Sequence, residues 1–405
     1  MSSTRRCNFS RAVPALLVVV LLASGCATTR RAPGFAEELA LGPGPGILLT
    51  NVPSLRADAA KGGISAVASL FAYWKKPVLS SEAESRLVAA MSSMLIPPEE
   101  VMIDLADRRL LWSYAFYATM REVEERLLSG IPLLVMVQDR ADDPKTRRYM
   151  ILMGFNQPAE KLLVHEGGRE PRVYTYAAFR PIWKPVRNWT LVLCPPDRIS
   201  WPLSVREWVA RSRFYERIGM WADALADLDT LQQNDPRNIN ILLAQARIHQ
   251  RARNPVAAEQ AYRDALVLDP LSARAANNLA YLLGQQPEQR REAERWARRA
   301  LTMEPSNPAY LDTLGMILLA LEQPAEAAVV LERARHRAAN LPLSARREIE
   351  IRLLRAFILS GQVHLAHQVW QDMVRLGGEV ELPPDLRDAL TKPPANHVDR
   401  EPPNR

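Results

Sequence analysis

The feature that most constrains the fold of this 405-residue chain is an acidic residue followed by proline, recurring at a nearly fixed interval. The dipeptides are Asp235-Pro236, Asp269-Pro270 and Glu304-Pro305, so successive prolines are 34 and 35 residues apart. A repeat of this length is typical of a solenoid built from helix pairs. Each proline would end the second helix of a pair, because it lacks the N–H that a helix interior needs. The sequence therefore predicts an all-α solenoid over residues 203–378.

Small side chains recur where the two helices of each predicted pair would touch. They are Ala224, Ala258, Ala293, Ala327 and Ala366, with Ala265, Ala300 and Ala334 at a second position. Trp208 and Tyr215 supply large side chains in the first helix of repeat one, and Leu314-Gly315 is a further matching pair. This pattern resembles the tetratricopeptide repeat, and the resemblance implies four regular repeats followed by one irregular terminal repeat.

The first 25 residues have the composition of a secretory signal. Three arginines precede the apolar stretch Ala12–Leu22, which is too short to span a bilayer. The stretch leads into Leu22–Cys26, which resembles a bacterial lipobox, and the resemblance implies that Cys26 becomes the acylated first residue of the mature chain. Ala27 after the cysteine favours the outer membrane on its periplasmic side, again by resemblance. An ordinary signal peptide that happens to end near a cysteine is the alternative.

A tether and a mixed region lie between the lipid site and the repeats. Residues 26–46 end in alternating glycine and proline, which form neither a helix nor a central strand. Residues 47–198 predict an α+β domain, because helices come first and strands rich in Val, Ile and Leu follow. We expect helices over Gly63–Trp74, Ser81–Met94, Pro98–Arg109 and Thr119–Leu128, and strands over Ile47–Pro53, Leu133–Gln138, Tyr149–Phe155, Lys161–His165 and Trp189–Leu193. Residues 379–405 carry three Pro-Pro pairs and many charges, and predict a disordered tail.

The mixed region resembles the papain-like, bacteriocin-processing cysteine peptidases. The resemblance rests on the order of the helix ending in Tyr73-Trp74, then Gly130-Ile131-Pro132 before a strand, then Arg148–Asn156, then Phe179 and Trp183. It implies a papain-like fold. It also implies altered catalytic positions: Lys61 for the nucleophile, Arg148 for the base, His165 or Glu166 for the orienting residue, and Leu55 or Arg56 for the oxyanion glutamine.

A cysteine peptidase needs a thiolate, a base that forms it and a group that orients the base. Arginine cannot act as a base at neutral pH. We therefore expect a catalytically inactive peptidase-like domain that retains Lys61, Arg148 and Glu166 only as degenerate positions. The alternative is an active peptidase or hydrolase that uses other residues.

Further candidates for chemistry are weak. His165 is expected at the surface, and it cannot easily pair with Glu166 because neighbours on a strand point to opposite faces. Cys194 is expected to be a buried structural thiol, and no intramolecular disulfide is expected, because Cys7 leaves with the signal peptide and Cys26 is lipidated. His364 and His367 could share a helix face, but two ligands without a third do not predict a metal site. We expect no cofactor and no metal.

The first helix of each repeat offers the predicted binding surface. Positions spaced 3, 4 and 3 along a helix share one face, which selects Arg206, Val209, Arg213 and Glu216 in repeat one, Asn240, Leu243, Arg247 and Gln250 in repeat two, and Arg274, Asn277, Tyr281 and Gly284 in repeat three. The arginines and asparagines among them are the expected binding residues, because Arg captures carboxylates through paired hydrogen bonds.

Composition and charge complete the functional expectation. The net charge of +7 favours an acidic partner. We see no run of basic residues interleaved with aromatics, which is the pattern that would indicate nucleic-acid binding. We expect a membrane-anchored adaptor that binds a peptide or protein. Two alternatives stay open: the selected helix faces are simply solvated on a spacer, or the chain is a scaffold whose first domain only packs against the repeats.

Overall fold

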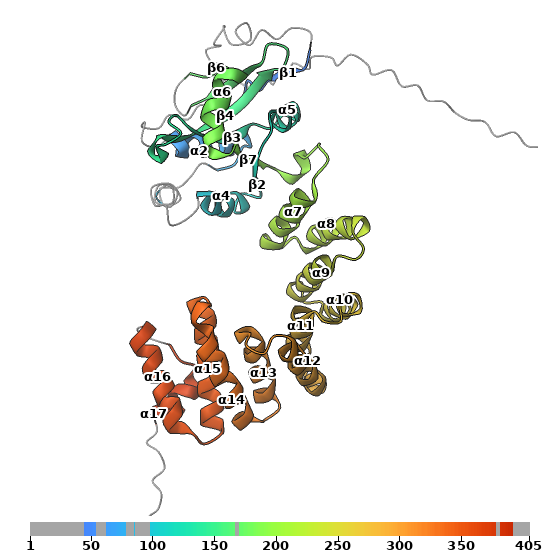
Figure 1. The fold of residues 1–405 in the computed structure, drawn as a ribbon, viewed down its shortest axis with the longest axis vertical. Coiled ribbons are helices and arrows are strands. Elements are labelled where there is room, and N and C mark those ends of the chain that lie inside the picture. Colours follow the sequence, from blue (N-terminus) through green and yellow to red (C-terminus); the bar gives the residue numbers. More distant parts are fainter. Residues whose placement is uncertain are drawn as a thin grey trace, which may run out of the picture.

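The computed structural model describes residues 44–53, 62–77, 85, 98–166, 170–377 and 381–391. Figure 1 shows a part that contains a β-sheet, followed by paired helices arranged along an arc. Cys26, Lys61 and all but one residue of the expected helix Ser81–Met94 lie outside the described residues. Within the described part, no helix combines the length and the apolar character needed to cross a bilayer.

The described sheet has seven strands, and every pairing in it is antiparallel. The strands are β1 Gly46–Leu48, β2 Trp112–Tyr117, β3 Leu133–Gln138, β4 Arg147–Asn156, β5 Lys161–His165, β6 Arg172–Thr175 and β7 Trp189–Cys194. Their order is β2-β7-β3-β4-β5-β6, and β1 pairs with the end of β4. The central strands β3, β4 and β7 are almost entirely buried, since apolar runs without alternation suit a sheet covered on both faces.

Four helices within the described ranges accompany the sheet: α2 Gly62–Tyr73, α4 Pro98–Asp107, α5 Met120–Leu128 and α6 Tyr176–Trp183. Helix α5 begins with a capping box formed by Thr119 and Glu122. The Thr119 hydroxyl accepts a hydrogen bond from the Glu122 amide at 3.3 Å, and the Glu122 carboxylate accepts one from the Thr119 amide at 2.7 Å. This reciprocal arrangement satisfies two amides that the first turn leaves without helical partners. The mixed helix and sheet content is therefore as expected.

Five helix pairs follow the sheet and confirm the predicted all-α solenoid. They are α7 Val205–Arg217 with α8 Trp221–Asn234, α9 Ile239–Arg251 with α10 Pro255–Leu268, α11 Ala273–Gly284 with α12 Arg290–Met303, α13 Pro308–Ala320 with α14 Pro324–Arg337, and α15 Leu343–Leu359 with α16 Val363–Gly377. All eight predicted contact alanines are fully buried. A Cβ atom added at Gly315 would lie 2.4 Å from Leu331 Cγ, so only glycine lets α13 approach α14 this closely.

The predicted disordered tail is wrong for part of its length. Residues Pro384–Thr391 form a helix, α17, that contacts α15 and α16. Leu382, Leu386 and Leu390 are buried in the same core as the solenoid helices. Leu386 and Leu390 are four residues apart and lie on one face of α17, with Leu382 just before the helix, and the free energy of burying these side chains outweighs the polar composition of the segment.

The sheet part and the solenoid share a hydrophobic core. Phe214 of α7 and Trp201 before it are buried in the core of the sheet part, while α8 packs with a different cluster. The boundary expected between residues 198 and 203 therefore divides the sequence but not the packing. The first helix of repeat one belongs to both parts.

Candidate functional site

Arg148 and Glu166, two of the three positions expected to be degenerate, come together on one face of the sheet, and Lys61 lies outside the described residues. The Arg148 guanidinium lies 3.4 Å from the Glu166 carboxylate and 3.0 Å from that of Asp139. The Tyr174 hydroxyl donates a hydrogen bond to Glu166. Burial alone would lower the pKa of Arg148, but its hydrogen bonds with Asp139 and Tyr174 and the nearby carboxylate charges raise that pKa above its ordinary value. The guanidinium is therefore held as a cation and cannot accept a proton.

His165 does not lie at the surface, contrary to expectation. It is 1% exposed and pairs across the sheet with Ile151 of β4. Burial lowers the pKa of His165, which favours the neutral imidazole. Since it follows the alternation of β5, it points to the face opposite Glu166. His165 thus lies on the other side of the sheet from Arg148 and Glu166. His165 and Glu166 therefore do not form an acid/base pair.

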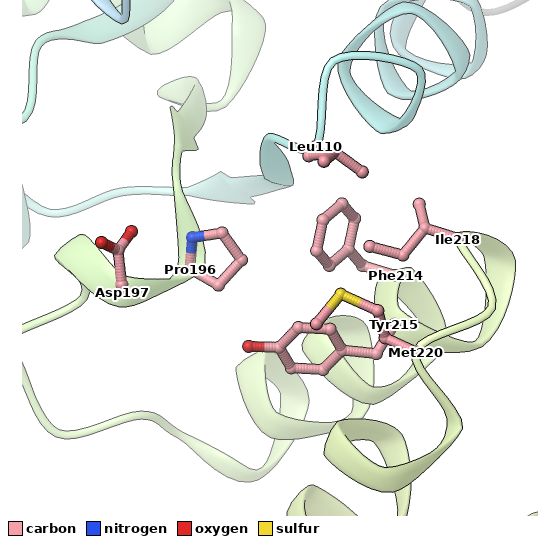
Figure 2. Close-up of a pocket in the computed structure, with 7 residues that line it drawn as sticks. All are labelled: Leu110, Pro196, Asp197, Phe214, Tyr215, Ile218 and Met220. Carbon is pink, nitrogen blue, oxygen red and sulfur yellow. The ribbon is translucent and has the colours of Figure 1, made fainter.

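A small pocket lies where the sheet part meets repeat one (Figure 2). Its volume is about 200 Å³, and its walls are Leu110, Pro196, Asp197, Phe214, Tyr215, Ile218 and Met220. Aromatic, proline and methionine side chains dominate the lining, with one carboxylate at Asp197. Six of the seven lining side chains are apolar or aromatic, so this recess suits an apolar side chain.

The predicted face of the first helices is continuous across repeats one to three. Arg247 of α9 binds Glu216 of α7 through two hydrogen bonds, at 2.9 and 2.8 Å. Arg274 of α11 donates to the side-chain oxygen of Asn240 on α9. These contacts run from each first helix to the previous one, so the exposed residues among those selected on α7, α9 and α11 form one surface. We call it the first-helix face.

The six expected binding residues differ in how they are placed. Arg206, Arg213, Asn240, Arg247 and Arg274 are exposed. Asn277, by contrast, is only 7% exposed, and its amide oxygen is buried without a hydrogen-bond partner among the described residues. The expectation that Asn277 presents its amide on the surface is therefore wrong. It lies beneath the face because its helix packs tightly against its neighbours.

Two groups on this face were missed as functional residues. Arg251 donates a hydrogen bond to Glu216 at 3.2 Å, and its guanidinium stands beside that of Arg247. The available signal was its spacing of four from Arg247, which places both on one side of α9. Glu216 was expected on the face, but its role as the shared partner of two arginines joins residues 31 and 35 positions apart and arises only in the folded chain.

The remaining expected features are the Cys194 thiol and the histidines of α16. Cys194 is buried as expected, and burial raises the pKa of its thiol. Within the described ranges, no three His, Cys, Asp or Glu side chains are grouped closely enough to hold a metal ion. His364 and His367 lie on α16, where His367 packs near Trp370.

Comparisons with known proteins give limited likeness. No protein family matches the chain. No curated protein matches it either. Among solved structures, it is similar to Pseudomonas aeruginosa PilF, with 22% identity over 43% of this chain and 77% of that one, at a TM-score of 0.38. It is also similar to PilW, a type IV pilus biogenesis factor, with 21% identity over 46% of this chain and 85% of that one, at a TM-score of 0.41. A third similar structure is that of MamA, with 15% identity over 44% of this chain and 96% of that one, at a TM-score of 0.36. At these scores the likeness assigns neither a family nor a function.

Proposed function

We propose that this chain is a membrane-anchored lipoprotein adaptor that binds an extended, acidic peptide or protein segment on the first-helix face. The peptidase-like part contributes no catalysis in this proposal. Its Lys61, Arg148 and Glu166 positions replace the groups that a cysteine peptidase requires, and the ion pairs of Arg148 keep it charged. Its role is to cover the outer side of α7 and so to cap the first repeat.

The charge of the first-helix face carries the proposal. Five arginines lie on it (Arg206, Arg213, Arg247, Arg251 and Arg274), against one glutamate, Glu216. Guanidinium groups bind carboxylates through paired, charge-assisted hydrogen bonds. A row of them along three successive helices suits an extended segment that presents several carboxylates, because each repeat can engage a different one.

A binding titration tests the proposal. The probe is dye-labelled hexaglutamate, with hexaglutamine as the neutral control, and the readout is fluorescence anisotropy at low salt. The test variant combines Arg213→Glu with Arg274→Glu, which leaves no buried carboxylate unpaired. The matched control combines Arg237→Glu with Arg295→Glu, which makes the same change in net charge at exposed arginines off the face.

We expect hexaglutamate to bind the wild type and the control variant, and to lose most of its affinity for the test variant. Binding should weaken with added salt, since exposed charges are screened. Equal affinity for the two variants would contradict the proposed site, because it would mean that only net charge matters.

The anchor is tested separately. Replacement of Cys26 by serine removes the sulfur that would carry the lipid. We expect the wild type to incorporate a labelled fatty acid and to sediment with membranes, and Cys26→Ser to do neither. Labelling of the serine variant, or unchanged sedimentation, would refute acylation at this residue as the means of attachment.

A further inference from the structure

Two arginines of α9 converge on one carboxylate of α7. Arg247 places Nε 2.9 Å and Nη2 2.8 Å from the two oxygens of Glu216. Arg251 places Nη1 3.2 Å from the first of those oxygens. The Glu216 side chain is 8% exposed, whereas those of Arg247 and Arg251 are 51% and 56% exposed. The carboxylate is thus buried beneath two cations whose other sides face solvent.

The charges of this group do not cancel. Two guanidinium groups carry two positive charges, and Glu216 supplies one negative charge. Each arginine has five N–H donors; Glu216 uses two of those on Arg247 and one on Arg251. Arg213 adds a third exposed cation one turn before Glu216 on α7. Donors and positive charge therefore remain for a second acceptor at the exposed side.

The geometry points to an anion subsite, built by Arg247 and Arg251, in which Glu216 is a ligand supplied by the protein itself. A carboxylate side chain of an acidic peptide binds at the exposed side and competes with Glu216 for the same guanidinium groups. This inference rests on the proposed function. It adds that the first-helix face binds acidic peptides more weakly with Glu216 present than its arginines would bind them without it.

A purely structural bridge would behave differently. If Glu216 only tied α9 to α7, its removal would lower stability and leave the affinity for an acidic peptide unchanged or weaker. If Glu216 competes, its removal frees guanidinium donors and removes a negative charge next to the incoming carboxylate, so affinity rises.

The first experiment compares Glu216→Gln with Asp227→Asn. Glutamine keeps the shape of glutamate and an acceptor oxygen, which limits damage to the fold. Asp227 is the matched control, because it binds Arg211 within the same repeat, at 2.7 Å, between α7 and α8. We expect hexaglutamate to bind Glu216→Gln on the order of tenfold more tightly than the wild type, and Asp227→Asn to bind as the wild type does. Unchanged or weaker binding by a Glu216→Gln protein with wild-type circular dichroism overturns the inference.

A chemical readout separates this inference from the proposed function. Phenylglyoxal modifies accessible guanidinium groups, and peptide mass spectrometry locates the adducts. We expect Arg247 to react faster in Glu216→Gln than in the wild type. Faster reaction without hexaglutamate binding in either protein would uphold Glu216 as occupant of the subsite and refute the proposed function. Equal reaction rates would overturn the occupancy itself.

A second variant covers the case in which Glu216→Gln does not fold. Arg251→Gln removes a half-exposed cation and leaves the two bonds between Arg247 and Glu216 in place. We expect wild-type thermal stability and weaker binding of hexaglutamate, by several-fold. Unchanged affinity would exclude Arg251 from the subsite and overturn the inference.

Discussion

At the scale of single residues, arginine has two distinct roles in this molecule. Arg213 and Arg206 are exposed on the first-helix face, where they can meet a partner. Arg126 is 5% exposed, stacks near the rings of Phe116 and Trp201, and binds Glu207 at 2.9 Å. The same side chain thus stabilises tertiary structure where it is buried and paired, and in the proposed function it serves recognition where it is hydrated.

Replacement of Arg126 by alanine tests the buried role. It leaves the Glu207 carboxylate, in the first turn of α7, buried with fewer donors, although Trp201 and Ser204 still bind it. We expect the free energy of unfolding to fall by about 3–5 kcal/mol. Arg121→Ala is the control, since Arg121 is 86% exposed beside Glu125, and it should change stability by less than about 1 kcal/mol. Similar losses in urea denaturation of the two variants would contradict the assignment.

Tyr262 makes stability depend on alkaline pH. The residue is 1% exposed, and burial raises the pKa of its phenol from 10.0 to about 12. The folded state therefore retains this proton more tightly than the unfolded chain. The resulting stability is fully present below pH 10 and is lost as the pH rises towards 12, on the order of 2 kcal/mol in all.

The variant Tyr262→Phe isolates this effect from the other tyrosines. We expect the wild type to lose more unfolding free energy than Tyr262→Phe between about pH 9 and about pH 11, by roughly 1 kcal/mol. The measurement is urea denaturation at the two pH values. Parallel losses in the two proteins would show that Tyr262 does not titrate differently on folding.

At the scale of elements, the close approach of α13 and α14 depends on Gly315. Gly315→Ala places a methyl group against the buried Leu331 side chain, and we expect a loss of about 1–3 kcal/mol from overpacking. Leu331→Ala should relieve the clash, so the double variant should lose less stability than the two single losses added together. Strict additivity in thermal unfolding would mean that the two residues do not press on each other.

The sequence predicted some helices and strands well and missed others, depending on how clear the residue pattern of each element is. Strands β3 and β5 begin and end where expected, because unbroken runs of Val, Leu and Met are typical of buried strands. Strand β2 was missed, although Trp112, Tyr114 and Phe116 alternate with small residues and lie on one face. Helix α6 was missed because Pro181 lies inside it.

The candidate site was predictable only in part. The spacing along each first helix predicted which side chains share a face, because the helical period decides which side chains lie together, and the role of that face in binding stays a prediction. The bonds from Arg247 to Glu216 and from Arg274 to Asn240 span 31 and 34 residues. They depend on how one repeat stacks on the previous one, and a single helix contains no information about that contact.

At the scale of the whole molecule, the sheet part caps the solenoid. A repeat array needs atypical ends, because its terminal helices would otherwise expose the apolar faces on which further repeats stack. Here Phe214 and Ile218 of repeat one pack against the sheet part, and α17 covers the other end with Leu386 and Leu390. The first domain and the first repeat therefore share one core.

A fragment of residues 203–391 tests the cap. Without the sheet part, Phe214 and Ile218 become exposed, and we expect self-association in size-exclusion chromatography with light scattering. The same fragment with Phe214→Ser and Ile218→Lys should remain monomeric. A monomeric unmodified fragment, as stable as the repeats in the whole chain, would contradict a capping role.

Site-specific photo-crosslinking in cells shows whether the first-helix face meets a partner. A photoreactive residue replaces Tyr281, which is 41% exposed on that face, or Val267, which is 78% exposed on a second helix. We expect a discrete adduct from position 281 that disappears with Arg213→Glu and Arg274→Glu. We expect no adduct of the same mass from position 267. Adducts of equal yield from both positions, or an adduct from 281 that survives the charge reversals, would contradict binding on this face.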